Sequence, residues 1–175
     1  MDNTWEITFT ELFDRCLAAY RSGNRDFTRY YTPEDSVFLA AIGCKPREFF
    51  DFIEDLADMG GPSREAALLI AAARRDYFLV EQEGELSSAE LTNAQLPARD
   101  AELGGFPWLP RMLAKARAKL KGELHPDVMY CCGGDRNFLS KNDMHPADFL
   151  RAVWAAEKAG DPDQAVAEYV QNAKS

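Results

Sequence analysis

One short segment of the chain carries many basic side chains and no acid. From Gly104 to Gly122 the formal charge is +5, whereas the remaining residues carry −14, within a net charge of −9. Apolar residues recur there at helical spacing, so the segment predicts an amphipathic helix whose basic face binds a phosphate, a carboxylate or an acidic partner. Alternatively, these cations only balance the helix dipole and solvate its outer face. They are Arg111, Lys115, Arg117, Lys119 and Lys121.

A second group of chemically versatile side chains follows directly. It holds both histidines and two of the four cysteines: His125, Cys131, Cys132, Asp135, Arg136 and His145. Thiolates and imidazoles are zinc ligands, and a cysteine beside an imidazole is an activated nucleophile. Adjacent cysteines do not easily bind one ion together, and neither thiol lies in a known catalytic motif. For His145, which precedes a helix-opening proline, a capping role is favoured. Cys16 and Cys44 occupy apolar positions and are expected in the core.

Two shorter motifs contain arginine. Gly133 and Gly134 precede Asp135 and Arg136 at an expected helix start, where backbone N–H groups can bind an anion. The simpler interpretation is a turn followed by an acid in the first helical turn. The pair Arg74-Arg75 interrupts an apolar run, and an ion pair between helices or between repeats is expected there.

Prolines and hydroxyl residues mark the helix starts that must position these side chains. Thr32-Pro33, Pro46 and Pro62-Ser63 each combine a break with a residue that opens a helix. Thr8 and Glu11 have the spacing of a capping box for the first helix. The pattern predicts an all-α protein.

The chain matches itself at an offset of 100 residues, with nine identical pairs between residues 30–70 and 130–170. The shared residues place helix starts, breaks and core aromatics, so we expect two tandem homologous units of four helices each, packed about a pseudo-twofold axis into one compact helical domain. The first members of the pairs are Tyr30, Asp35, Phe38, Leu39, Pro46, Phe49, Gly60, Pro62 and Ala67.

The predicted organisation has three parts. A first helical repeat spans residues 1–82, a connecting segment spans 83–105, and a second repeat spans 106–175. The connecting segment lacks helical periodicity. Because structureless loops of this length are uncommon in compact domains, it is expected to form a short helix near 88–91 or 100–103, or to lie across the surface.

The second repeat resembles a family of small bacterial proteins known only as a domain of unknown function. The resemblance covers about residues 106–172, and it implies no established reaction, ligand or catalytic residue. The first repeat departs from the signature, since Glu11-Leu12 replaces Arg111-Met112. The signature residues are Leu109-Pro110-Arg111-Met112, Lys115-Ala116-Arg117-Ala118, Gly134-Asp135-Arg136, Phe138-Leu139 and Pro146 with Asp148-Phe149-Leu150.

Composition narrows the class of protein. With 46% apolar and 28% charged residues in 175, the chain is typical of a globular protein. Its acidic balance disfavours nucleic acid and anionic membranes as partners. No secretory signal and no membrane span is recognisable, so a cytoplasmic location is expected. No cofactor and no metal is predicted.

The sequence therefore favours a non-catalytic binding or protein-interaction module with a cationic site in the second repeat. Its partner is expected to be a small anion or an acidic protein. The alternative is a small enzyme or metal-binding protein that uses Cys131 or Cys132 with His125 or His145. The predicted ligand-binding residues are Arg111, Lys115, Gly134, Asp135 and Arg136.

Overall fold

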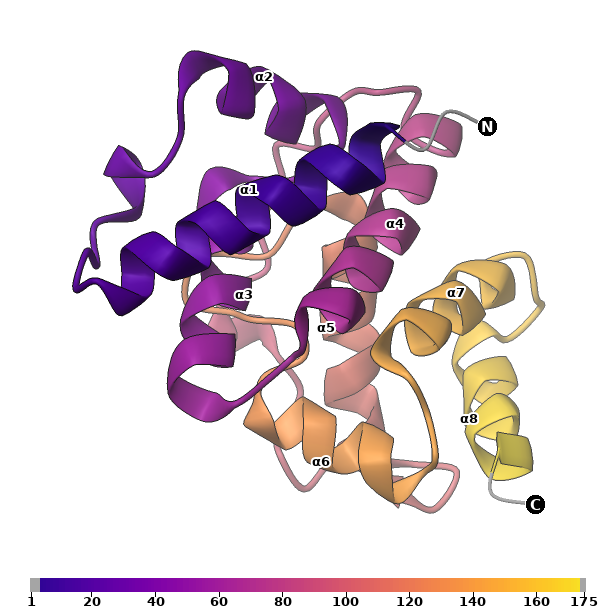
Figure 1. The fold of residues 1–175 in the computed structure, drawn as a ribbon. Helices are drawn as coiled ribbons and strands as arrows, with labels where there is room; N and C mark the ends of the chain where they lie inside the picture. The colour runs from indigo at the N-terminus through magenta and orange to yellow at the C-terminus, as the bar shows by residue number, and fades with distance from the viewer. Residues whose placement is uncertain (1–3, 174–175) are drawn as a thin grey trace.

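Helices make up nearly all of the regular structure in the computed structural model, which describes residues 4–173 (Figure 1). The all-α prediction is confirmed. The α-helices are α1 (Thr4–Arg21), α2 (Pro33–Ala41), α3 (Pro46–Met59), α4 (Arg64–Val80), α5 (Leu109–Lys121), α6 (Gly133–Lys141), α7 (Pro146–Ala156) and α8 (Pro162–Ala173). Two short 3-10 helices, η1 (Phe27–Arg29) and η2 (Asn93–Gln95), and two strands, β1 (Glu102–Leu103) and β2 (Phe106–Pro107), complete the fold.

Most predicted helix starts are where the local chemistry places them. Thr32 and Asp35 form a reciprocal capping box at α2, and the Ser63 hydroxyl accepts the N–H of Ala66 at α4. The capping box predicted at Thr8 is wrong, because α1 already includes this residue and its hydroxyl donates to the Thr4 carbonyl at 3.0 Å. The apolar stripe that begins at Trp5 extends the helix toward the N-terminus.

The two halves have helices in matching places. α2 and α6 begin and end 100 residues apart, and α3 and α7 both begin at a proline. Phe49 and Phe149, which lie 100 residues apart, are both fully buried. A single core cluster contains residues of both halves. The two halves therefore share one hydrophobic core and are not two independent domains.

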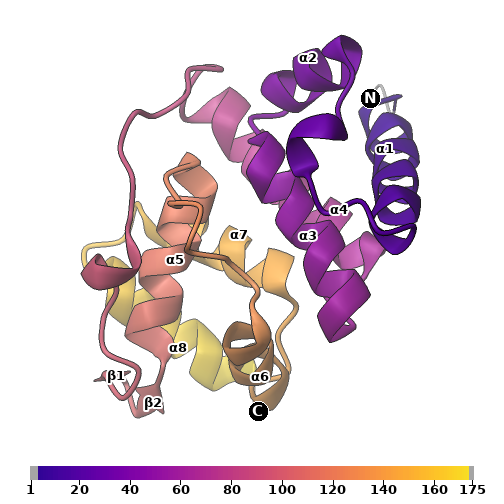
Figure 2. The ribbon, with the colours of Figure 1, turned by 90° about the vertical axis from the view of Figure 1, so that its left-hand side faces the viewer.

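The contacts between the halves differ from the predicted pseudo-twofold. α4 packs against both α5 and α7 (Figures 1 and 2). A twofold axis would require the same contact in return, between α8 and the pair α1 and α3. Within residues 4–173, α8 instead packs mainly on α7 and β1. β1, at the end of the connecting segment, therefore contacts α5 and α8 of the second half. The corresponding helices of the first half, α1 and α4, are covered by other helices.

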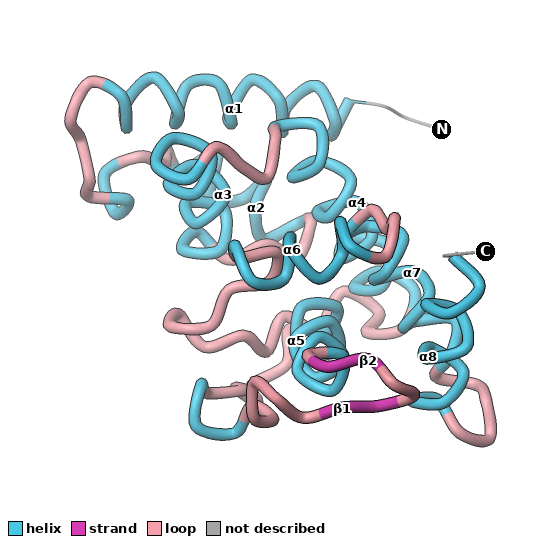
Figure 3. Tube along the Cα trace, turned by 90° about the horizontal axis from the view of Figure 1, so that it is seen from below, coloured by secondary structure: helices cyan, strands magenta, loops and turns pink. Residues whose placement is uncertain are grey.

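The connecting segment lies along α5 and ends in a small hairpin (Figures 2 and 3). Leu91 forms an isolated bridge with Leu124, and β1 pairs with β2 across Gly104 and Gly105. Both glycines have positive φ, 58° and 80°, as a two-residue hairpin turn requires. Of the predicted alternatives, neither 88–91 nor 100–103 forms a helix; the segment runs across the surface beside α5, and the only helical turn in this part of the described chain is η2. No helix within residues 4–173 has the length and apolarity that crossing a membrane demands.

Candidate functional site

Two of the five basic residues of α5 lie in buried ion pairs inside the protein. Lys119 is 3% exposed, and its Nζ lies 2.6 Å from Glu48 Oε1 on α3, so this ion pair joins the two halves. Burial alone would raise the pKa of the Glu48 carboxyl, but the nearby Lys119 ammonium holds it below its ordinary value. Arg117 pairs with Asp163 on α8. The predicted outward basic face is therefore wrong for Lys115 and Lys119, both of which point inward.

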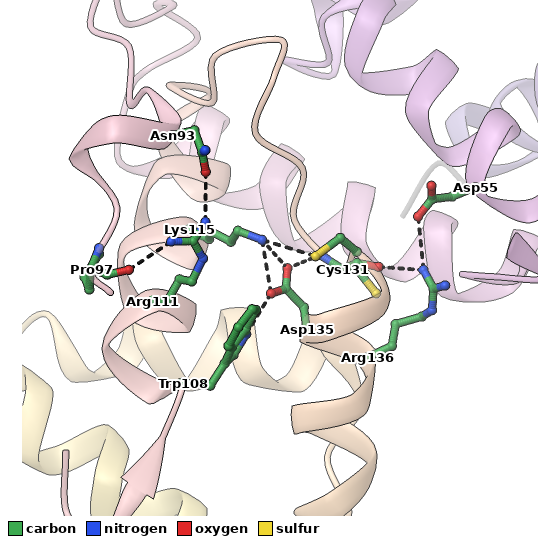
Figure 4. A network of polar contacts seen from close by, with 10 residues as sticks. Asp55, Asn93, Pro97, Trp108, Arg111, Lys115, Cys131, Asp135 and Arg136 are labelled. Carbon is green, nitrogen blue, oxygen red and sulfur yellow. Dashed lines mark hydrogen bonds and ion pairs between the residues drawn. The ribbon is translucent and has the colours of Figure 1, made fainter. Parts of the chain in front are cut away.

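A buried network surrounds Asp135 at the start of α6 (Figure 4). This carboxylate has no solvent exposure and accepts from Lys115 Nζ at 2.9 and 3.1 Å, from Trp108 Nε1 at 3.1 Å and from the Cys131 N–H at 3.0 Å. The third proton of the Lys115 ammonium is directed to Cys132 Sγ, 3.3 Å away. Both charges are thus paired and hydrogen-bonded, as buried charges must be.

The indole of Trp108 joins this network, and the backbone of Trp108 has an unusual conformation. Its φ is 74°, in the left-handed region, immediately before α5. The indole lies against Gly134, where any Cβ would come within 2.7 Å of the ring. Gly134 is therefore required for packing, which supplies a structural reason for one residue predicted to bind an anion.

Arg111 and Arg136 do not meet in one pocket. Arg111 donates to the Pro97 carbonyl at 2.9 Å and to Asn93 Oδ1 at 2.8 Å, so it anchors the connecting segment on α5. Arg136 lies on the other side of the Asp135 network (Figure 4). The predicted pocket that combines both arginines is not formed.

Arg136 instead lines a cleft between the two halves. Its Nη1 donates to Asp55 Oδ2 on α3 at 3.1 Å and to the Cys131 carbonyl at 2.9 Å. The cleft has a volume of about 630 Å³. The first half contributes the loop before α4, including Gly61 and Ser63, and the second half contributes α6 and the turn that leads to His145. The first-half residues could not be predicted from the sequence, because only the fold brings them to this cleft.

The histidines and cysteines do not form one centre. The predicted capping role of His145 is confirmed, since its Nδ1 accepts the N–H of Ala147 at 3.2 Å. His125 likewise accepts the N–H of Asp127 and lines a different, smaller cleft. Burial raises the pKa of the Cys131 thiol to about 12. Within residues 4–173, no group of three or more His, Cys, Asp and Glu side chains is arranged to hold a metal ion.

The remaining cysteines and Arg74 belong to the core. Cys16 and Cys44 are buried, as predicted, and burial raises the pKa of these thiols to about 11 and about 12. Arg74 is 1% exposed, but the predicted ion pair is wrong. Its Nη1 donates to Gln82 Oε1 at 2.7 Å, and its guanidinium lies over the Phe78 ring at 5.0 Å. Among the described residues, Arg75 forms an ion pair only with its neighbour Asp76, and its guanidinium lies over the Trp5 ring, 5.1 Å from the centroid.

Residues 95–175 match the sequence profile of a family described as a domain of unknown function (DUF5069). The second half is therefore similar to an uncharacterised family, in agreement with the resemblance of its motifs. The match begins within the connecting segment, so it includes Pro97, which Arg111 binds. No curated protein matches the chain. No solved structure matches it either.

Proposed function

We propose that the protein is a non-catalytic binding module that holds a small carboxylate- or phosphate-bearing ligand at Arg136 in the cleft between the halves. One observation carries the proposal. Nη1 of Arg136 is fixed by two acceptors, while Nε and Nη2 make no hydrogen bond with any residue in 4–173. A guanidinium held this way presents a free edge that suits two oxygens of one anion.

The surroundings of Arg136 support an anion. The N-terminal ends of α4 and α7 border the cleft at Ser63 and Pro146, and helix N-termini carry positive partial charge. Gly61 lies beside the guanidinium, where a Cβ would stand 3.6 Å from Nε. Asp55 neutralises part of the charge but occupies only Nη1. The ligand would therefore contact both halves of the molecule.

Calorimetric titration with inorganic phosphate and with citrate tests this proposal. Arg136→Ala should weaken binding about tenfold or more, as loss of a charge-assisted bidentate contact does. Arg111→Ala should have little effect on affinity, because its partners are in the connecting segment, and Lys121→Ala serves as the matched control. Equal losses in all three variants that disappear in added salt would contradict a defined site.

A thiol site at Cys132 is the second candidate, and it preserves the alternative of a small enzyme. Cys132 is the N-cap residue of α6, is partly exposed and accepts a hydrogen bond from the Lys115 ammonium. Cysteines at helix N-termini beside a cation are the reactive ones. Iodoacetamide at neutral pH should then label Cys132 ahead of the three buried thiols. Uniformly slow labelling would remove this candidate.

We also infer that the chain arose by tandem duplication and acts in a reducing cytoplasm. The duplication is supported by an ion pair that recurs at the same offset, Arg15 with Asp35 and Lys115 with Asp135. All four cysteines are free, which suits a reducing compartment. Superposition of residues 30–70 on 130–170 in an experimental structure tests the first inference, and fractionation of the native host tests the second.

A further inference from the structure

A second cleft lies on the opposite side of α6 from Arg136. It has a volume of about 390 Å³ and shares no residue with the cleft between the halves. From α6 and its end it takes Gly134, Phe138, Lys141 and Asn142, which follow one helix face. Arg99 of the connecting segment and the β2–Trp108 turn form the other wall.

Asn142, one of the residues that line this cleft, has a buried amide oxygen without a partner among residues 4–173. Asn142 is 3% exposed, and its Nδ2 donates to the Phe138 carbonyl at 2.7 Å, which sets the orientation of the amide. Its Oδ1 is buried and accepts no hydrogen bond from residues 4–173. Such an orphaned acceptor costs stability, and the equivalent residue of the first half, Ile42, fills the same kind of buried position with an apolar side chain. The amide nitrogen of Asn142 binds the last turn of α6, but folding gives its amide oxygen no partner among the described residues.

The same cleft presents positive charge and aromatic surface. Arg99 and Lys141 are exposed at its border, and neither has an ion pair or side-chain hydrogen bond with the described residues. Trp108, with Phe106 and Phe138, supplies aromatic walls. Clefts of this size with aromatic walls and a few polar groups are typical of small-molecule sites.

We propose that this cleft binds a small aromatic anion that donates an N–H or O–H to Asn142 Oδ1 and directs its carboxylate or phosphate to Lys141 and Arg99. The ligand satisfies the orphaned acceptor and supplies the missing counter-charge. Every lining residue falls within 95–175, so the part of the chain that matches the uncharacterised family builds the whole site. The site is independent of the cleft at Arg136.

Four matched probes separate the two requirements. Para- and meta-aminobenzoate carry both the anion and the donor, benzoate carries only the anion, and benzamide lacks the charge. Titrations of the full chain are followed by the indole N–H signal of Trp108 in two-dimensional NMR, assigned with Trp108→Phe. An aminobenzoate should shift this signal and the amide signal of Gly134, and should bind about tenfold more tightly than benzoate or benzamide.

Three variants make the test specific. Asn142→Ile copies the first half, so it should fold and should bind aminobenzoate no better than benzoate. Lys141→Ala should weaken the binding of all three anionic probes about threefold to tenfold. Arg136→Ala should leave these titrations unchanged, so the two proposals fail separately. The inference is overturned if no probe shifts the Trp108 and Gly134 signals, or if Asn142→Ile retains the preference for aminobenzoate.

Discussion

The starts of α2 and α6 hold equivalent residues in different surroundings. Asp35 and Asp135 are each the third residue of their helix, and each pairs with a basic residue of the first helix in its half. The side chains of Arg15 and Asp35 are 47% and 14% exposed, whereas those of Lys115 and Asp135 are 5% and 0% exposed. The same contact is a surface ion pair in one half and a buried one in the other.

The helix ends themselves also differ. Thr32 closes the N-terminus of α2 by accepting the N–H of Asp35, whereas Cys132 makes no side-chain cap at α6. Asp135 turns its carboxylate to Lys115, Trp108 and the Cys131 N–H. The first half therefore uses the N-cap side chain for local stability, while the Cys132 side chain caps no N–H of α6 within the described residues. Both proposed clefts border α6, but they rest on Arg136 and Asn142 and not on the N–H groups at its start.

The comparison breaks most visibly if Phe49 and Phe149 do not contribute equally to the core. Phe49 and Phe149 are both fully buried, so truncation of either to alanine should cost about 3–5 kcal/mol of unfolding free energy. Urea unfolding followed by circular dichroism measures both values. A loss below about 1 kcal/mol at either position would show that the residue is not a core anchor and that the halves are built differently.

The ion pairs should differ sharply in their effect on stability. Asp135→Ala leaves the buried Lys115 ammonium without its partner, which should cost about 3–5 kcal/mol. Arg15→Ala removes an exposed member of the equivalent pair and should cost less than about 1 kcal/mol. The double variant Lys115→Met with Asp135→Leu should recover part of the loss, because no charge remains buried. Equal costs for the two single variants in denaturant unfolding would refute the contrast in burial.

Helix starts were predictable from sequence because their causes are local. A proline with a preceding hydroxyl defines the start of α2 without reference to the rest of the chain, and the capping role of His145 follows from the proline after it. The direction of the α5 cations was not predictable in this way. Lys119 turns inward because Glu48, 71 positions away in the chain, meets it across the two halves.

The surroundings of the candidate site residues depend even more than the α5 cations on contacts between residues far apart in the chain. Arg111 is occupied by Pro97 and Asn93, which lie in a segment whose hairpin has no strong strand pattern. Asn142 carried a usable signal, since it stands opposite Ile42 in the repeat and polar replacement of an apolar core position requires an explanation. Its missing partner is visible only in the folded structure.

A pH-dependent difference is expected between Asp51 and its equivalent, Arg151. Burial raises the pKa of Asp51 to about 7 despite the attraction of Arg47, whose Nε lies 3.1 Å away. The folded state therefore holds a proton that the unfolded chain releases near pH 4, and this group's contribution to stability falls as the pH rises from 4 to 7.

Asp51→Asn should thus raise the unfolding free energy by about 1–3 kcal/mol at pH 8 and by much less at pH 4. Arg151, whose side chain is 44% exposed, should tolerate Arg151→Gln with a change below about 0.5 kcal/mol at both pH values. Thermal and urea unfolding across this range provide the measurement. A destabilised Asp51→Asn at pH 8 would mean that the ion pair with Arg47 outweighs the burial of the carboxylate.

The smallest expected effect tests the open end of α6 directly. Cys132→Ser introduces a hydroxyl that can accept the N–H of Asp135, as Thr32 does for Asp35, and can still accept from Lys115. It should stabilise the protein by about 0.5–1 kcal/mol, and Thr32→Ala should cost about the same amount at α2. Cys132→Ala is the matched control, because it removes the thiol without adding a cap. If serine and alanine give the same unfolding free energy, the N–H groups of α6 are already satisfied, and the two helix starts do not differ in their capping.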